Sequence, residues 1–271
     1  MSISSLQAFL RTEALPHFWC AGCGNGIVLG ALVRAFVRLE LDPTRVVVVT
    51  GIGCWGKADD YLLTHAFHVT HGRALAFATG IKVVRPDLTV LALMGDGDGA
   101  TIGGNHLIHA ARRNVDVTAV VVNNQNYGMT GGQYSATTPA ESCTSTSPYG
   151  NPEDALDICA LADAAGANYV ARSTVYHVRQ LENFICEAIT KKGFSLVEAA
   201  SICPTHYGRN NRLGTPTEML RRLREQAVPL ARGEVGGDRI VIGRLVERER
   251  EDFNARYEAV RRRAVEGGRL G

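Results

Sequence analysis

The 271-residue sequence contains no long apolar run, no strong excess of charge of one sign and no internal repeat. Its longest apolar stretches, such as the four valines at 46–49, have the length of a strand and are too short to span a bilayer. The formal net charge of +2 gives no reason to expect binding to nucleic acid. We therefore expect neither a membrane nor a nucleic acid among the partners of this protein.

The start of the sequence also lacks a basic segment, a continuous apolar segment and a cleavage site, so we expect no signal peptide. Without export, the default location is the reducing cytoplasm, where thiols stay free or bind metal. The seven cysteines, an odd number, fit that expectation better than a disulfide framework. A hydrophobic content of 45% and a charged content of 21% are typical of a globular protein with a sizeable core.

Short runs of β-branched residues alternate with longer segments of helical periodicity, which predicts an α/β fold with a parallel sheet and helices on both faces. The expected strands are 45–50, 88–94, 117–122 and 194–200. The expected helices are 25–40, 71–84, 103–113, 152–166 and 176–192, the fourth starting at Pro152 after the cap Asn151. Because the sequence becomes more charged toward its C-terminus, we expect one domain over 1–225 and a charged arm over 226–271.

Each expected strand is followed by an unusual segment. These segments are GIGCWGK after the first strand, GDGDGA after the second, NNQNYGMTGG after the third and SICPTHYGRNN after the fourth. The carboxyl ends of parallel strands lie along one edge of a sheet, where such folds bind their ligands. We therefore expect the four segments to form one site.

Asp96 and Asp98 lie between glycines directly after a strand, near the start of a helix whose amide groups can face an anion. An acid beside an anion implies a bridging cation, and Mg²⁺ prefers oxygen ligands together with phosphate oxygens. Asn124 and Asn126 return to the same edge one strand–helix–strand unit later. Either segment alone is more simply a tight turn, but together they resemble the GDG…NN signature of thiamine diphosphate enzymes. That resemblance implies that Asp96, Asn124 and the carbonyl of Asn126 hold Mg²⁺ against the diphosphate.

Four cysteines accompany these segments. Cys20 and Cys23 alone are compatible with a redox dithiol, half of a zinc site, half of an iron–sulfur site or a disulfide loop. Cys54 and Cys203, on the expected ligand edge, complete a four-thiolate set that suits zinc or a [4Fe–4S] cluster equally well by ligand type. We favour the iron–sulfur cluster, because thiamine diphosphate generates an electron-rich intermediate whose electrons a redox centre can accept.

Longer segments resemble the β subunit of the 2-oxoacid:ferredoxin oxidoreductases, in particular the 2-oxoglutarate branch. They are WCAGCGNG, GIGCWGKADDY, THGRALAFATGIK, MGDGDGATIGGNH, NNQNYGMTGGQYS and CPTHYGRNN, and the resemblance covers most of the chain. Ala21 departs from the family's usual Cys-Pro-Gly-Cys but leaves the ligand spacing intact. The resemblance implies oxidation of 2-oxoglutarate with coenzyme A to succinyl-CoA and CO₂, electron transfer through a [4Fe–4S] cluster to ferredoxin, and an α subunit that supplies the activating glutamate. We expect the chain to be inactive alone.

The same resemblance assigns Cys20, Cys23, Cys54 and Cys203 to the iron–sulfur cluster. It implies that the cofactor is bound by His71, Gly95, Asp96, Gly97, Asp98, Asn124, Asn126, Gly128, Met129 and Thr130. Lys57, three residues after Cys54 on the ligand edge, is either an exposed loop lysine or a binder of the substrate carboxylate, and we predict the second role. The open alternatives are a pyruvate or branched-chain 2-oxo acid as substrate, a non-redox thiamine decarboxylase or synthase subunit with structural zinc, and a non-catalytic zinc scaffold.

Overall fold

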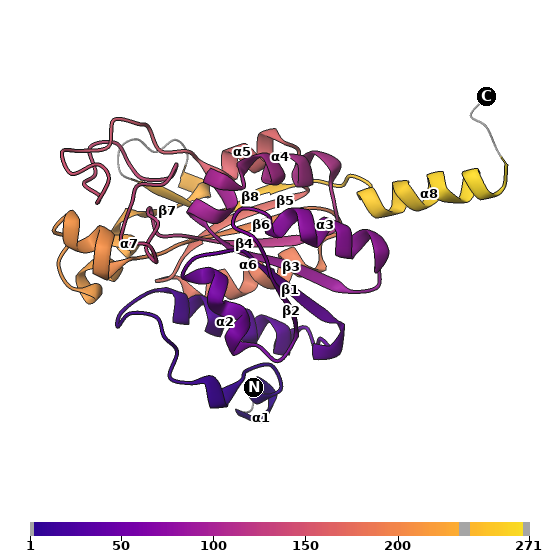
Figure 1. Cartoon of the computed structure of the whole chain (residues 1–271), viewed down its shortest axis with the longest axis horizontal. Coiled ribbons are helices and arrows are strands. Elements are labelled where there is room, and N and C mark those ends of the chain that lie inside the picture. Colours follow the sequence, from indigo (N-terminus) through magenta and orange to yellow (C-terminus); the bar gives the residue numbers. More distant parts are fainter. Residues whose placement is uncertain (1–2, 233–238, 268–271) are drawn as a thin grey trace.

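The computed structural model describes residues 3–232 and 239–267, and its strands form one eight-stranded sheet (Figure 1). The strands are β1 (Val46–Thr50), β2 (His65–His68), β3 (Thr89–Gly95), β4 (Thr118–Asn123), β5 (Tyr169–Thr174), β6 (Ser195–Ala200), β7 (Ala227–Pro229) and β8 (Ile240–Glu247). Their order is β2-β1-β3-β4-β6-β5-β8-β7, and each neighbouring pair is parallel except β5 and β8. The expected α/β fold is confirmed.

Helices cover both faces of this sheet (Figure 1). One face carries α2 (Asn25–Arg38) and α6 (Val178–Thr190), and the other carries α3 (Ala74–Val84), α4 (Gly104–Arg113) and α5 (Ile158–Ala164). The remaining helices are α1 (Ile3–Gln7), α7 (Pro216–Gln226) and α8 (Phe253–Val265). No helix within the described ranges combines the length and the apolar character that crossing a bilayer requires.

The alternation of side chains along each strand explains why the strands are apolar throughout. Val46 and Val48 of β1 enter the core beneath α2 and α6, whereas Val47 and Val49 enter the core beneath α3 and α4. Burial on both faces requires continuous β-branched runs. The four strands expected from the sequence are all present.

The start of the fourth expected helix is wrong. α5 begins at Ile158 rather than at the expected proline, because Asp157 caps it by accepting a hydrogen bond from the amide of Ala160 at 2.9 Å. The expected cap, Asn151, instead donates from Nδ2 to the carbonyl oxygen of Thr138 at 2.9 Å. Its side chain therefore organises the loop before α5 and not the helix.

The range 226–271, expected to be a charged arm, contributes two strands, β7 and β8, to the sheet. β8 pairs with β5, while α8 projects away from the rest of the domain and buries none of its residues (Figure 1). Residues 233–238 and 268–271 of this range lie outside the described residues. The arm stays a prediction for α8, whereas β7 and β8 belong to the sheet.

The loops after β1, β3, β4 and β6 all leave the same edge of the sheet, because these four strands are parallel neighbours. Three of the loops begin with short helical segments. These are a 3₁₀ segment at Trp55–Tyr61 and π segments at Gly97–Ile102 and Pro204–Gly208. π segments are rare in proteins, but those that occur are often found at functional sites, so this edge is the expected position of the site.

Candidate functional site

A cavity lies where these loops meet. All ten residues predicted to bind the cofactor line it, together with Cys54. Further lining residues, not predicted from the sequence to bind the cofactor, are Ile52, Gly53, Trp55, Val122 and Tyr127. Parallel pairing therefore brings the predicted cofactor set together around one cavity at the carboxyl ends of β1, β3 and β4.

Asp96, directly after β3, is 1% exposed. Its Oδ2 accepts hydrogen bonds from the hydroxyl groups of Ser135 at 2.6 Å and Thr137 at 2.7 Å, and its Oδ1 lies 3.4 Å from the amide nitrogen of Asn124. Burial raises the pKa of the Asp96 carboxyl, and these hydrogen bonds oppose the rise. Because the two hydroxyls occupy Oδ2, Oδ1 is the better placed oxygen for a cation.

The sequence did not predict Ser135 and Thr137 as supports of Asp96. Both lie in the long loop between β4 and α5, and their hydroxyl oxygens are 3.0 Å apart. Thr138 ties the same segment to the site, because its hydroxyl donates to the carbonyl oxygen of Gln125 at 2.6 Å. The signal that points to them is the hydroxyl-rich run SATT, in a loop longer than an ordinary connection.

The turn after β4 places Asn124 and Asn126 beside Asp96. Gln125 between them is in the left-handed region with φ 64°, and the amide of Asn126 donates to Oδ1 of Asn124 at 3.4 Å. The Asn126 side chain is buried, and neither its Oδ1 nor its Nδ2 has a hydrogen-bond partner within the described ranges. Since buried polar atoms normally have partners, an orphaned amide here fits a bound ligand.

Asp98 orients His71 at the same cavity. Its Oδ1 accepts hydrogen bonds from Nδ1 of His71 at 2.5 Å and from the amide of Gly72 at 2.6 Å. His71 therefore keeps its Nε2 for a second partner. The buried Oδ2 of Asp98 lacks a partner in the described part of the chain, and Gly51 leaves room for it, because a Cβ there would lie 2.0 Å away.

The sulfur atoms of Cys54 and Cys203 adjoin this cavity. Cys54 itself lines the cavity, and a Cβ built on Gly128, another lining residue, would lie 3.6 Å from the sulfur of Cys54 and 3.5 Å from that of Cys203. Burial raises the pKa of the Cys54 thiol to about 12 and that of Cys23 to about 11, and the other thiols of the four-cysteine set raise both. Only a neighbouring positive charge, such as that of a metal, would favour ionised thiolates here.

The spacing of the four sulfurs bears on the zinc alternative. A zinc ion with Zn–S bonds of about 2.3 Å brings its thiolates to roughly 3.8 Å from one another. Among the described residues, no three of Cys20, Cys23, Cys54 and Cys203 have their sulfurs within 4.8 Å of one another. In a [4Fe–4S] cluster each thiolate binds a different iron, so the four sulfurs lie farther from one another than around a single zinc ion. As they stand, the four sulfurs do not form a closed zinc site, and the iron–sulfur cluster stays a prediction.

Two tryptophans fix the loop that carries Cys54. The indole nitrogen of Trp19 donates to the carbonyl oxygen of Cys54 at 2.6 Å, and its ring lies 5.9 Å from that of Trp55. Trp55 is 2% exposed and donates to the carbonyl oxygen of Val120 in β4 at 3.3 Å. The bulky residue after Cys54 thus anchors the loop to the sheet.

Comparison with known proteins gives the family of this chain. Residues 51–199 match the C-terminal thiamine pyrophosphate-binding domain of thiamine pyrophosphate enzymes. The chain is 46% identical over 251 residues to the 2-oxoglutarate synthase subunit KorB of Methanocaldococcus jannaschii, covering 90% of this chain and 93% of that one. It is 36% identical over 270 residues to the β subunit of 2-oxoacid:ferredoxin oxidoreductase 2 of Aeropyrum pernix, covering 92% and 86%.

A solved structure agrees with these relatives. The 2-oxoglutarate:ferredoxin oxidoreductase from Magnetococcus marinus, with 2-oxoglutarate, coenzyme A and succinyl-CoA bound, superposes with a TM-score of 0.86 at 32% identity, covering 98% of this chain and 92% of that chain. The chain belongs to the β subunits of the 2-oxoacid:ferredoxin oxidoreductases. The resemblance stated from the sequence is confirmed.

One predicted residue of this β subunit, Lys57, does not line the cavity. Its Nζ lies 2.7 Å from Oδ2 of Asp60, in a pair whose side chains are 36% and 45% exposed. The hydrogen bond from Lys57 to Asp60 raises the pKa of the lysine. To contact a substrate carboxylate, the ammonium group of Lys57 must therefore leave Asp60. Binding of the substrate by Lys57 stays a prediction.

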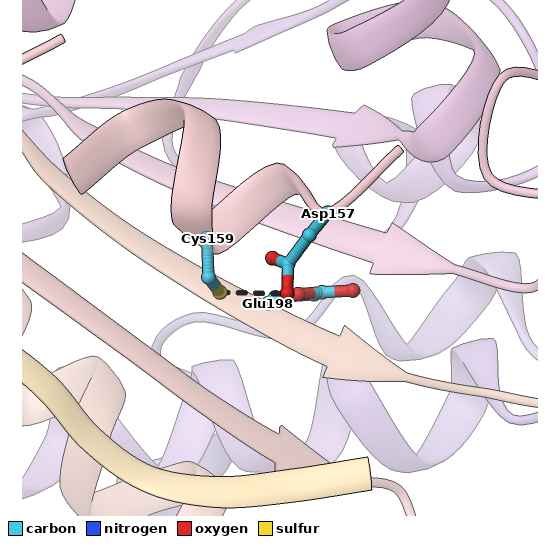
Figure 2. A group of neighbouring side chains, drawn as sticks. All are labelled: Asp157, Cys159 and Glu198. Atoms are coloured by element: carbon cyan, nitrogen blue, oxygen red, sulfur yellow. Dashed lines mark hydrogen bonds between the residues drawn. The ribbon is translucent and has the colours of Figure 1, made fainter. Parts of the chain in front are cut away.

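Behind the site, Asp157, Cys159 and Glu198 form a compact group that resembles a metal site (Figure 2). Figure 2 shows the sulfur of Cys159 directed toward Glu198, to whose Oε2 it donates at 3.1 Å. However, Arg172 of β5 pairs with Oε2 of Glu198 at 2.7 Å and with Oδ1 of Asp157 at 2.5 Å. The guanidinium group supplies the positive charge that these carboxylates need, so we assign the group to structure and not to metal binding.

This buried ion pair also holds the turn of the candidate magnesium site. Oε1 of Glu198 accepts a hydrogen bond from Nδ2 of Asn123 at 2.8 Å. Oδ1 of Asn123 in turn accepts one from the amide of Gln125 at 3.1 Å. Glu198 therefore connects the core of the sheet to the residues that lead into Asn124.

Removing Glu198 should destabilise the protein strongly. Glu198→Ala leaves the guanidinium of Arg172 largely buried with one partner fewer, and breaking a buried ion pair costs about 3–5 kcal/mol. Urea denaturation measures the loss in the free energy of unfolding. As a matched control, Asp87→Ala removes the carboxylate of the exposed pair with Arg85 and should leave the unfolding midpoint close to the parent. Equal shifts for the two variants would contradict the role of the buried pair.

Proposed function

We propose that this chain is the subunit that holds thiamine diphosphate, Mg²⁺ and a [4Fe–4S] cluster in an enzyme that oxidises 2-oxoglutarate. The reaction joins the decarboxylated acyl group to coenzyme A, releases CO₂ and passes two electrons to two ferredoxin molecules. The observation that carries the proposal is the contact between two sites. Cys54 lines the cavity that holds the orphaned Asn126 amide, and Gly128 of the same lining lies against the sulfurs of Cys54 and Cys203.

In this proposal, Asp96 and the turn after β4 hold Mg²⁺. Oδ1 of Asp96, the side-chain oxygen of Asn124 and the backbone carbonyl of Asn126 are oxygen ligands of the kind that Mg²⁺ prefers. Ser135 and Thr137 keep the Asp96 carboxylate in position through Oδ2. When bound, thiamine diphosphate supplies the chemistry that stabilises the charge left by decarboxylation.

The side chains around the cavity then bind the organic part of the cofactor and the substrate. His71, oriented by Asp98 through Nδ1, is proposed to contact the cofactor through Nε2. Met129, which is 44% exposed at the cavity, offers an apolar contact. Lys57 is proposed to bind the carboxylate of the 2-oxo acid once it leaves Asp60.

We further propose that Cys20, Cys23, Cys54 and Cys203 bind the [4Fe–4S] cluster, which supplies a one-electron relay when bound. The position of the Cys54 and Cys203 sulfurs beside Gly128 of the cavity supports this assignment. The proposed location is the reducing cytoplasm, where cysteines stay available as metal ligands. The glutamate that activates the cofactor is proposed to come from an α subunit.

The magnesium site is tested by Asp96→Ala. The variant loses a magnesium ligand and the negative charge that holds the cation. At the same Mg²⁺ concentration it should therefore bind thiamine diphosphate at least about a hundredfold more weakly than the parent, a loss on the order of 2.7 kcal/mol. Titration of protein fluorescence with the cofactor measures the affinity. Asp87→Ala, at an exposed position, is the control and should bind as the parent does. Parental affinity of Asp96→Ala would refute the assignment.

The iron–sulfur cluster is tested on protein purified without oxygen. The parent should be brown and contain about four iron and four sulfide per chain. Cys54→Ala should lose most of the iron while thiamine diphosphate binding stays detectable. Cys186→Ala, a cysteine buried in the core beside α2, should keep the full iron content. A colourless parent with stoichiometric zinc would exclude the proposal.

The role of Lys57 is tested in the reconstituted αβ enzyme. A hydrogen bond to a charged group contributes about 1.5–3 kcal/mol, so Lys57→Ala should lower kcat/KM for 2-oxo acids by about ten- to a hundredfold. Asp60→Asn removes the competing partner of Lys57 and should not lower kcat/KM. Cofactor and iron contents should equal those of the parent in both variants. An unchanged kcat/KM for Lys57→Ala would make Lys57 an ordinary loop lysine.

A further inference from the structure

We propose that exposed arginines beside Cys20 form the docking surface for an acidic electron-carrier protein of the ferredoxin class. We define the arginine surface as Arg209, Arg212, Arg221 and Arg224 together with the loop 20–24. The proposal rests on the proposed function, because it concerns the route by which electrons leave the [4Fe–4S] cluster. It goes further by assigning the face of this chain that receives the carrier.

The four cysteines are not equally accessible. Cys20 is exposed, Cys23 and Cys54 are half-buried, and Cys203 is buried. The cavity adjoins the sulfurs of Cys54 and Cys203, whereas Cys20 meets solvent. The set thus has one end at the cavity and another at the surface, and an electron carrier reaches the iron–sulfur cluster most closely on the Cys20 side.

The loop 20–24 packs directly against the elements that surround it. A Cβ on Gly22 would lie 2.4 Å from Cβ of Pro216, the first residue of α7. A Cβ on Gly24 would lie 3.0 Å from a methyl group of Val175, which precedes the exposed Tyr176. The start of α7 and the end of β5 therefore border the exposed ligand loop on the surface.

Positive charge is concentrated on these bordering segments. Residues 204–226 contain five arginines and two glutamates. One glutamate, Glu218, is used locally, because it accepts hydrogen bonds from the amide and the hydroxyl group of Thr215 and closes the capping box of α7. The face of α7 opposite the buried Met219 and Leu223 carries Arg221 and Arg224, both of which are exposed.

Two exposed aromatic side chains adjoin the same surface. Phe18 is 52% exposed next to the ligand loop, and Tyr176 is 41% exposed beneath the guanidinium of Arg224, 5.7 Å from its ring centroid. Aromatic residues at the centre and charges at the rim are typical of protein interfaces. A small interface steered by charge suits an electron carrier, which must bind, receive one electron and leave twice in each turnover.

The test measures the affinity of an oxidised acidic [4Fe–4S] ferredoxin for the reconstituted αβ holoenzyme at low ionic strength. The double variant Arg221→Glu/Arg224→Glu should raise Kd at least tenfold, because it turns attraction into repulsion. The KM for ferredoxin should rise with it. Reduction of methyl viologen, a small cation that needs no docking surface, should not fall. In the parent, added salt should weaken ferredoxin binding.

The matched control is Arg262→Glu/Arg263→Glu on α8, which makes the same change of charge on the opposite side of the molecule from α7 (Figure 1). It should keep the parental Kd within about twofold. An unchanged Kd for the α7 variant, or an equal rise for both variants, would overturn the proposal. Failure of a folded α7 variant to assemble with the α subunit would also overturn it, because it would place α7 in the subunit interface. A parent without iron would instead refute the proposed function.

Discussion

Parallel pairing of β1, β3, β4 and β6 is the constraint on which the whole site depends. Because neighbouring parallel strands end at the same edge, loops that are far apart in the sequence become adjacent there. Asp96 follows β3, the asparagine turn follows β4, Cys54 follows β1 and Cys203 follows β6. A change in the order of these strands would separate the candidate magnesium ligands from the cysteines.

The buried charged groups of this chain are compensated in different ways. The carboxylate of Glu198 faces an arginine, so that ion pair is complete within the chain. The Asp96 carboxylate accepts hydrogen bonds from two hydroxyl groups and a long one from an amide. One oxygen of Asp98 has no partner among the described residues. Asp96 and Asp98 line the cavity, whereas Glu198 lies behind it. This contrast separates groups that await a ligand from groups that support the fold.

Much of this arrangement could be predicted from the sequence. Continuous valine runs mark strands that are buried on both faces, and the ligand segments follow these strands. The ligand-binding edge of the sheet and the set of cofactor-binding residues could therefore be predicted. β5 was not predicted, because its buried Arg172 and the polar residues after it interrupt the apolar pattern. The predicted start of α5 was too early, because the Asn151 side chain donates to a loop carbonyl and Asp157, farther along the chain, caps the helix. Ser135 and Thr137 were missed because their role depends on a loop returning to β3, which no local pattern encodes.

The central claim is that the cavity and the four cysteines act as one unit, and substrate-driven reduction tests it most directly. The reconstituted αβ enzyme, loaded with thiamine diphosphate and Mg²⁺, is mixed anaerobically with 2-oxoglutarate in the absence of ferredoxin. Absorbance and electron paramagnetic resonance then follow the iron–sulfur centre. The account predicts rapid bleaching and the appearance of a reduced [4Fe–4S] signal, both lost in Asp96→Ala. An iron–sulfur centre that stays oxidised while the fully loaded enzyme releases CO₂ would contradict it.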